Sequence, residues 1–321
     1  MSRLSLSRRL LLTAFAAFAV PAASASAAET YPVKPITLVI PFQGGITEQV
    51  GRLYGTELEK VLGVPVIVDV RPGAGGTVGA KHAAKAAADG YTLVVTDGLS
   101  QETARGEFDS FAQLEAITGI MSQPFLLYVK PDSDIKDFKG YVDFAKANPG
   151  KVSYGSVGPN TTAHIIGQAL EKAAGAQFVH VPYRGGGAQA LAVLSGEATS
   201  GYLTAAFFKP YFENQQLRPL AVVASQRNPV YPDVPTVTEL GYPTLAPLFS
   251  WWGIFAPKGL PADVKQKLVE AGRKLEEAGE LTSFIRKSGG EVLEFGPEAT
   301  EKHVRSDIEF WKTYLAEAPK G

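Results

Sequence analysis

The 321-residue sequence contains no cysteine. This absence excludes disulfide bonds, thiolate metal sites and a cysteine nucleophile. The histidines do not have the close spacing of zinc ligands, since they lie at His82, His164, His180 and His303. No glycine-rich loop carries the lysine of a phosphate-binding loop. We therefore expect neither a cofactor nor a bound metal.

An excess of positive charge is also lacking. The chain has 31 Lys and Arg against 32 Asp and Glu, a formal net charge of −1. Three of the arginines lie in residues 1–28, so removal of this segment would leave a net charge of −4. Binding to nucleic acid requires a strongly basic face. We therefore expect no nucleic-acid partner.

Residues 1–28 have the pattern of an export signal. Arg3, Arg8 and Arg9 precede the apolar run Leu10–Val20, and small residues follow with a cleavage point near Ala27 or Ala28. The apolar run is too short to span a membrane, which argues against the alternative of an uncleaved anchor. The pair Arg8-Arg9 leaves both the general and the twin-arginine export routes open. The sequence predicts a periplasmic protein.

Strand and helix patterns alternate through the remaining 293 residues, which exceed one usual domain. Strand patterns at 36–40, 66–70 and 91–95 are separated by helical patterns, the second at 78–88, which predicts a parallel βαβαβ unit. A second α/β series starts at residue 125, and two amphipathic helices at 261–288 and 297–315 end the chain. We predict two Rossmann-like α/β domains around a ligand cleft, 29–127 with 248–321 and 128–247. Chain crossings near residues 128 and 248 would form a hinge.

The remaining enzyme motifs are incomplete. The loop that begins at Gly73 lacks the third glycine of a dinucleotide-binding loop, and Tyr154 stands where a nucleophile elbow at Ser156 requires glycine. We therefore predict a binding protein and not an enzyme. An exported hydrolase with an unrecognised site is the remaining enzyme alternative.

Two small-residue turns follow predicted strands and lead into helices, at 43–47 and 156–162. Helix N-termini at the carboxyl ends of parallel strands attract anions through free N–H groups and the helix dipole. Each turn by itself could be an ordinary connection, capped by Thr47 in the first case and by Asn160 or Thr161 in the second. Two such turns, one in each predicted domain of an exported protein, favour a ligand site.

Several aromatic residues have two interpretations. They could line a ligand pocket or belong to the core, as most such residues do; they are Tyr202, Phe207, Phe208, Phe249, Trp251 and Trp252. Tyr183 and Arg184 end a predicted strand near the expected cleft and are secondary candidates for ligand contacts.

A set of short segments, in order along nearly the whole chain after residue 30, resembles one known family. They are Tyr31–Phe42, Gly44-Gly45 with Thr47, Arg71–Gly76, Ala88–Leu93, Ala145–Gly150, Tyr154–Ser156, His180–Gly185 and Pro232–Thr236. The chain resembles the substrate-binding receptors of tripartite tricarboxylate transporters (TctC or Bug type). The resemblance implies a cleft in which the two turns hold a ligand carboxylate through backbone and water contacts. It also implies membrane transporter subunits as partners, and we expect the receptor itself to be monomeric.

The candidate ligand-binding residues belong to these turns and to nearby segments. They are Gly44, Gly45, Ile46, Thr47, Ser100, Ser156, Asn160, Thr161, Thr162, His164, Tyr202 and Thr204.

The sequence departs from the family pattern at several points. The first turn is one residue shorter, Glu48 replaces an aspartate, and the loop after Thr96 is abbreviated. Leu203-Thr204 stands where many relatives have Asp-Asn. The loss of this acid favours an aromatic or aliphatic acid over an amino acid. We predict a periplasmic receptor for a small organic or aromatic carboxylate, with a ligand sensor for a signalling partner as the alternative.

Overall fold

The computed structural model describes residues 31–96 and 99–317. The predicted export signal at 1–28 lies outside the described residues. Within the described part of the chain, no helix combines the length and apolar character needed to cross a membrane.

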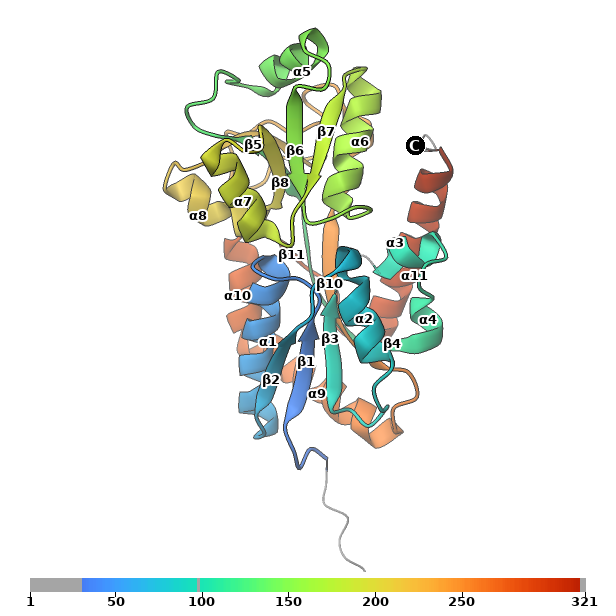
Figure 1. Ribbon diagram of the computed structural model, residues 1–321. Coiled ribbons are helices and arrows are strands. Elements are labelled where there is room, and N and C mark those ends of the chain that lie inside the picture. Colours follow the sequence, from blue (N-terminus) through green and yellow to red (C-terminus); the bar gives the residue numbers. More distant parts are fainter. Residues whose placement is uncertain (1–30, 97–98, 318–321) are drawn as a thin grey trace, which may run out of the picture. The chain divides into compact units, whose positions relative to one another are not determined.

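The first sheet has six strands in the order β11-β4-β10-β3-β1-β2 (Figure 1). Strands β1, β2 and β3 are parallel, as the βαβαβ pattern predicts, whereas β10 runs antiparallel to both β3 and β4. The strands are β1 (Ile36–Ile40), β2 (Val66–Val70), β3 (Thr92–Thr96), β4 (Leu114–Gln123), β10 (Ser250–Pro257) and β11 (Glu291–Val292).

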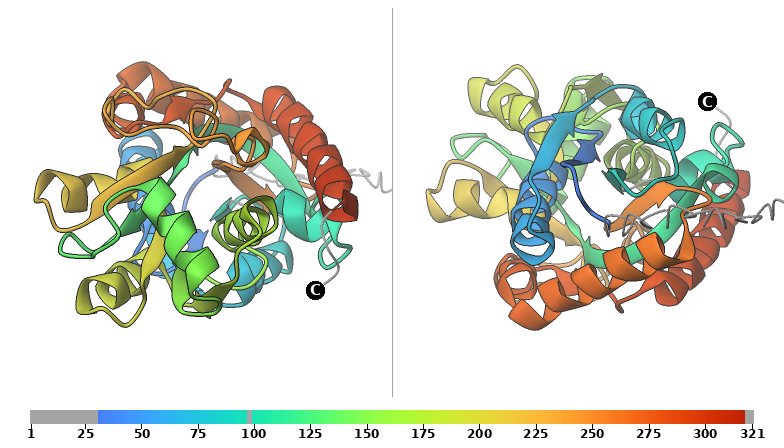
Figure 2. Two further views of the ribbon diagram at one scale, coloured as in Figure 1. Left: turned by 90° about the horizontal axis from the view of Figure 1, so that it is seen from above. Right: turned by 90° about the horizontal axis from the view of Figure 1, so that it is seen from below.

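Seven helices of the described chain accompany this sheet. They are α1 (Ile46–Leu62), α2 (Thr77–Ala84), α3 (Leu99–Ala104), α4 (Ser110–Gln113), α9 (Ala262–Ala278), α10 (Glu280–Lys287) and α11 (Pro297–Glu317). Helix α1 buries Val50, Tyr54 and Leu58, whose spacing of four residues forms one apolar face. The C-terminal helices return to this sheet, and α9 and α11 both pack against β4 (Figure 2).

The second sheet has five strands in the order β7-β6-β8-β5-β9. They are β5 (Phe125–Val129), β6 (Val152–Ser156), β7 (Phe178–Pro182), β8 (Ser200–Thr204) and β9 (Arg218–Val223). Strand β6 is parallel to β7 and β8, and β5 is antiparallel to β8 and β9. The accompanying helices are α5 (Phe138–Ala147), α6 (Thr162–Ala174), α7 (Gly186–Ser195) and α8 (Ala205–Glu213). The predicted class, two α/β sheets with helices, is confirmed.

The structure corrects several details of the predicted elements. The second helix ends at Ala84 and not near Ala88, and the helix predicted over 261–288 is broken by Gly279, which has φ 83°. Three strands were missed, namely β4, β8 and the two-residue β11. Strand β4 occupies a stretch without regular alternation, and all five residues of the central strand β8 are buried, so neither strand has the alternation of a half-exposed strand.

The chain passes from the first sheet to the second at Pro124 and returns between β9 and β10. Both passes are attached to the turn after α10. The fully buried Gln123 accepts a hydrogen bond from the backbone N–H of Ala206 (2.7 Å), and its amide nitrogen lies 3.5 Å from Ser288 Oγ. In the returning segment, Asn228 Nδ2 donates to the carbonyl of Gly289 (2.7 Å).

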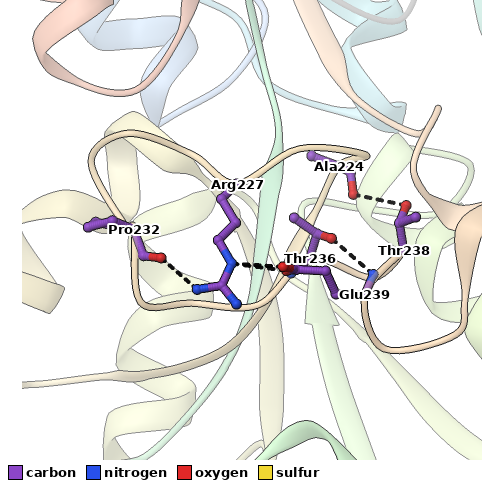
Figure 3. A network of polar contacts seen from close by, with 6 residues as sticks. All are labelled: Ala224, Arg227, Pro232, Thr236, Thr238 and Glu239. Atoms are coloured by element: carbon purple, nitrogen blue, oxygen red, sulfur yellow. Dashed lines mark hydrogen bonds and ion pairs between the residues drawn. The ribbon is translucent and has the colours of Figure 1, made fainter.

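The returning segment is held by its own polar network (Figure 3). Arg227 Nε donates to both carboxylate oxygens of Glu239 (2.9 and 3.1 Å), and its Nη1 donates to the carbonyl of Pro232. Glu239 in turn accepts from the backbone N–H of Thr236, whose hydroxyl accepts from the N–H of Glu239. This reciprocal pair is a capping box, and it fixes the conformation of a connection that contains no strand.

Apolar clusters cover the faces of both sheets, and α11 contributes to two of them. Val304 and Ile308 pack with Trp251 and Phe255 beside the first sheet. Trp311, one turn further along, belongs to the main cluster of the second sheet. Helix α11 therefore connects the two cores.

Candidate functional site

The first turn lies between β1 and α1. Gly44 has φ 61°, and its N–H donates to the carboxylate of Glu48 (2.7 Å). This hydrogen bond, followed by the partner Arg52, holds the pKa of Glu48 below its usual value. Thr47 is buried, and its hydroxyl accepts a hydrogen bond from Trp252 Nε1 (2.8 Å). One of the backbone N–H groups expected to attract an anion at this turn thus already donates to a side chain of α1.

The second turn, between β6 and α6, is held by its own side chains. The hydroxyls of Ser156 and Thr161 both bond to the carbonyl of Gly158 (2.9 and 2.8 Å). The backbone N–H of Asn160, a residue with φ 62°, donates to His164 Nδ1 (3.0 Å). The turn therefore depends on an unprotonated nitrogen of His164.

Thr162, the first residue of α6, connects this turn to the first sheet. Its buried hydroxyl accepts from Gln101 Nε2 (2.6 Å) and lies 3.3 Å from Ser250 Oγ at the start of β10. The hydroxyls of Ser156, Thr161 and Thr162 are therefore all bonded to protein groups.

A pair of neutral histidines supports the second turn. The rings of His164 and His180 are 4.0 Å apart between centroids, and His180 Nε2 lies 2.7 Å from Ser156 Oγ. Burial lowers the pKa of His180 to about 4, and His164 adds to this shift. Burial and then Arg105 lower the pKa of His164. Protonation of either ring is therefore disfavoured in the folded protein.

We expect the folded protein to lose stability as the pH falls from about 6.5 towards 4. In this window the unfolded histidine, with its ordinary pKa near 6.5, binds more protons than the folded one, so acid favours unfolding. The contribution of His180 is complete above pH 6.5 and amounts to about 1–2 kcal/mol, because its half-exposed ring is screened by solvent. Urea unfolding at pH 7 and pH 5 measures it.

The matched variant is His180→Gln, which keeps a hydrogen-bonding group near Ser156 but does not titrate. Its loss of stability between pH 7 and pH 5 should be smaller than that of the wild type. An equal loss in both proteins would assign the acid sensitivity to other groups.

A small cavity of about 50 Å³ lies where helices from both sheets begin. The first turns of α1, α6 and α7 contribute Ile46, Ala163 and Gly186, and Thr204 is the N-cap residue of α8. The full lining is Phe42, Gly45, Ile46, Thr47, Phe125, Val157, Ala163, Gly186, Tyr202, Leu203, Thr204, Phe207 and Trp252. None of these residues is charged. Four positive helix ends therefore face an uncharged space.

The side chain of Thr204 in this lining has no hydrogen-bond partner among the described residues. Its hydroxyl is buried, and no described group lies within hydrogen-bonding distance of it. A buried hydroxyl without a partner is costly, and an anion in the cavity would supply one.

A larger cavity of about 540 Å³ shares the lining residue Phe42 with the small one. It is bounded by the start of α2, by α3 and by the second turn. The lining is Phe42, Ala74, Gly75, Thr77, Lys81, Gln101, Glu102, Arg105, Glu107, Pro159, Asn160, Thr161 and Thr162.

The two sheets also meet directly through backbone groups. The N–H of Gly187, in the first turn of α7, donates to the carbonyl of Gly44 (2.7 Å). A Cβ on Gly185 would lie only 1.7 Å from the carbonyl oxygen of Gln43. This contact therefore depends on the absence of a side chain at Gly185.

The predicted ligand-binding residues fall into three groups. Gly45, Ile46, Thr47, Tyr202 and Thr204 line the small cavity. Asn160, Thr161 and Thr162 line the large one. The lining of neither cavity includes Gly44, Ser100, Ser156 and His164.

Sequence reasoning missed several contributors to these cavities, among them one glycine and three charged residues. Gly186 has a visible signal, the three consecutive glycines at the start of α7. No sequence signal marked the charged residues Lys81, Glu102 and Arg105, because the segments that carry them were not identified as neighbours of the second turn. Of the secondary candidates, Tyr183 donates to Glu197 (3.1 Å) and lines neither cavity.

The comparisons with known proteins agree with this architecture. Residues 50–318 match the family described as the tripartite tricarboxylate transporter family receptor (TctC). The UPF0065 protein in the gbd 5′ region of Cupriavidus necator is 37% identical over 274 residues, which cover 84% of this chain and 83% of that protein.

Two solved structures are also similar. The periplasmic binding protein BugD has a TM-score of 0.85 at 27% identity, with 90% of this chain and 98% of that chain covered. R. palustris Rpa4515 with adipate has a TM-score of 0.84 at 26% identity and the same coverage. The fold and site define a solute-binding protein of the periplasmic type. The chain belongs to the tripartite tricarboxylate transporter receptor family.

Proposed function

We propose that this chain is a non-catalytic periplasmic receptor that closes on a small carboxylate and delivers it to the membrane subunits of a tripartite transporter. The observation that carries the proposal is the uncharged small cavity at four helix N-termini, with the unpartnered hydroxyl of Thr204 in its wall. Anions are stabilised at helix N-termini by backbone N–H groups and the helix dipole. Family membership, and the adipate in the R. palustris relative, support a carboxylate as this anion.

The expected export signal and domain division belong to the same proposal. Residues 1–28 would direct export, and 29–127 with 248–321 would move against 128–247 about the two chain passes. Each sheet supplies part of the cavity lining, so a ligand there favours the closed arrangement by its contacts with both.

We expect small acids to stabilise the mature protein and their neutral esters not to. Adipate, hexanoate and benzoate, each beside its methyl ester, provide the comparison in a thermal-shift assay. A hydrogen bond to a charged group contributes about 1.5–3 kcal/mol, so the acid should bind at least about tenfold more tightly than its ester. Equal stabilisation by acid and ester would contradict a carboxylate site.

The variant Thr204→Val tests whether the ligand binds in the small cavity, because it removes the hydroxyl and preserves the shape of the side chain. The affinity for the acid, measured by calorimetric titration, should fall at least about tenfold. Thr118→Val is the control, since Thr118 is also buried but lines neither cavity. Its affinity should equal that of the wild type.

A further inference from the structure

The small cavity can hold little more than a carboxylate group. Its volume is about 50 Å³, whereas one water molecule needs roughly 10–15 Å³ of cavity volume, so the space has room for a group of a few atoms. The rest of a ligand anchored there needs other space. Phe42 lines both cavities, and the adjacent residues Thr162 and Ala163 of α6 line one each. The cavity of about 540 Å³ is therefore the neighbouring space available to the ligand.

Glu102 is a buried acid in the wall of this larger cavity. Only 5% of the residue is exposed. Among the described residues, its carboxylate receives a hydrogen bond from Thr77 and forms no ion pair. Burial raises the pKa of Glu102 to about 7, against the opposing effects of Thr77 and Arg105. A buried carboxylate with so few partners is costly unless a further donor reaches it.

The other charged groups of the cavity do not supply this donor. Arg105 pairs with Glu107 (3.0 Å) and its Nη1 lies 3.4 Å from the carbonyl of Asn160. Lys81 is exposed, so its charge is screened by water. A second ligand carboxylate beside Glu102 would meet repulsion from a like charge.

We propose that the larger cavity receives the end of the ligand remote from the anchored carboxylate, and that Glu102 there accepts a hydrogen bond from an ammonium or hydroxyl group. This inference rests on the proposed function. The ligand is then an acid with a hydrogen-bond donor, such as an amino or hydroxy acid. The pattern at Leu203-Thr204 favoured an aromatic or aliphatic acid, whereas Glu102 brings an acidic group into the larger cavity from α3.

Four six-carbon acids test this assignment, because they differ only in the remote group. They are 6-aminohexanoate, 6-hydroxyhexanoate, hexanoate and adipate. Calorimetric titration at pH 8 should show that the two donor-bearing acids bind at least about tenfold more tightly than hexanoate and adipate. Preference for the ammonium or for the hydroxyl distinguishes the two sources of the donor.

Glu102→Gln should abolish the advantage of 6-aminohexanoate and keep the shape of the side chain. Glu57→Gln is the matched control, because Glu57 is also a buried glutamate but lines neither cavity. This control variant should keep the wild-type order of affinities for the four acids. Thermal melts of both variants verify that they are folded.

The pH dependence gives a second readout. The charged groups around Glu102 are Lys81 on α2, Arg105 and Glu107 at the end of α3, and His164 on α6, whose pKa is lowered by burial. The affinity for 6-aminohexanoate should therefore rise between pH 6 and pH 8 in the wild type, as Glu102 ionises, and stay level in Glu102→Gln.

The two proposals fail in different ways. If the acids bind but hexanoate or adipate is preferred, or if Glu102→Gln keeps the wild-type order, the assignment of Glu102 is overturned and the carboxylate receptor stands. If none of the acids in either panel binds, the proposed function is overturned, and the role of Glu102 with it.

Discussion

Gly185→Ala should weaken ligand binding about 100-fold or more, which corresponds to about 2.8 kcal/mol. The added Cβ would lie 1.7 Å from the carbonyl oxygen of Gln43, whereas real contacts of this kind stay above 3.0 Å. The first turns of α1 and α7 must then separate by more than 1 Å, and the hydrogen bond from Gly187 to Gly44 is lost. A ligand held by both sheets loses part of its contacts when they cannot approach.

Calorimetric titration with the best-binding acid measures this effect, and small-angle scattering shows whether the ligand still closes the receptor. Gly187→Ala is the control, because its Cβ would lie 3.3 Å from the carbonyl oxygen of Gly44 and needs only a small adjustment. It should change affinity less than fivefold. A folded Gly185→Ala protein with wild-type affinity would show that binding does not require this contact.

Gly167→Ala should destabilise the protein by about 2–3 kcal/mol, although alanine is the better helix former. Its Cβ would lie 2.2 Å from the ring of Tyr154, which is 2% exposed. The ring packs edge-on against Tyr202, and its hydroxyl bonds to the carbonyl of His164 (3.3 Å). The clash therefore forces α6 away from the second sheet, because the ring has no free space to enter.

Urea unfolding measures the loss. Gly140→Ala in α5 is a suitable comparison, because its Cβ would lie 3.3 Å from a side-chain oxygen of Asp137 and meet no ring. That variant should be as stable as the wild type or more stable. The double variant Tyr154→Leu with Gly167→Ala should recover part of the stability lost by Gly167→Ala alone. If Gly167→Ala is as stable as the wild type, the close packing of α6 on Tyr154 is not rigid.

The fold class could be predicted because the strands of the first sheet are short apolar runs separated by turns. Ile36–Ile40 and Val66–Val70 are bounded by proline or glycine, and the helix between them has one apolar face. Strand β8 could not be found in this way. It lies between β6 and β5 with both faces covered, and its Gly201 is required by the close approach of Tyr128 and Gln189. The pattern of neighbouring residues in the sequence does not indicate burial on both faces of a strand.

The candidate site could be predicted only where it depends on residues that are close together in the sequence. A glycine-rich turn between a strand and a helix marks a helix N-terminus, so the positions of both turns followed from the sequence. The partners of their side chains did not. Thr162 bonds to Gln101, and Thr47 bonds to Trp252, residues 61 and 205 positions away along the chain. Such pairings depend on how the sheets pack, which residue spacing does not encode.

The turn that follows α10 holds both passes of the chain, through Gln123 and Asn228. The two passes therefore share one fixed point, and neither can slide along α10 without breaking a buried hydrogen bond. Glycine is required at 289 and 290 for this close approach, since a Cβ at either position would lie within 3 Å of one of the two amide side chains. We therefore expect any relative motion of the two sheets to pivot at this turn, where buried hydrogen bonds hold both passes of the chain.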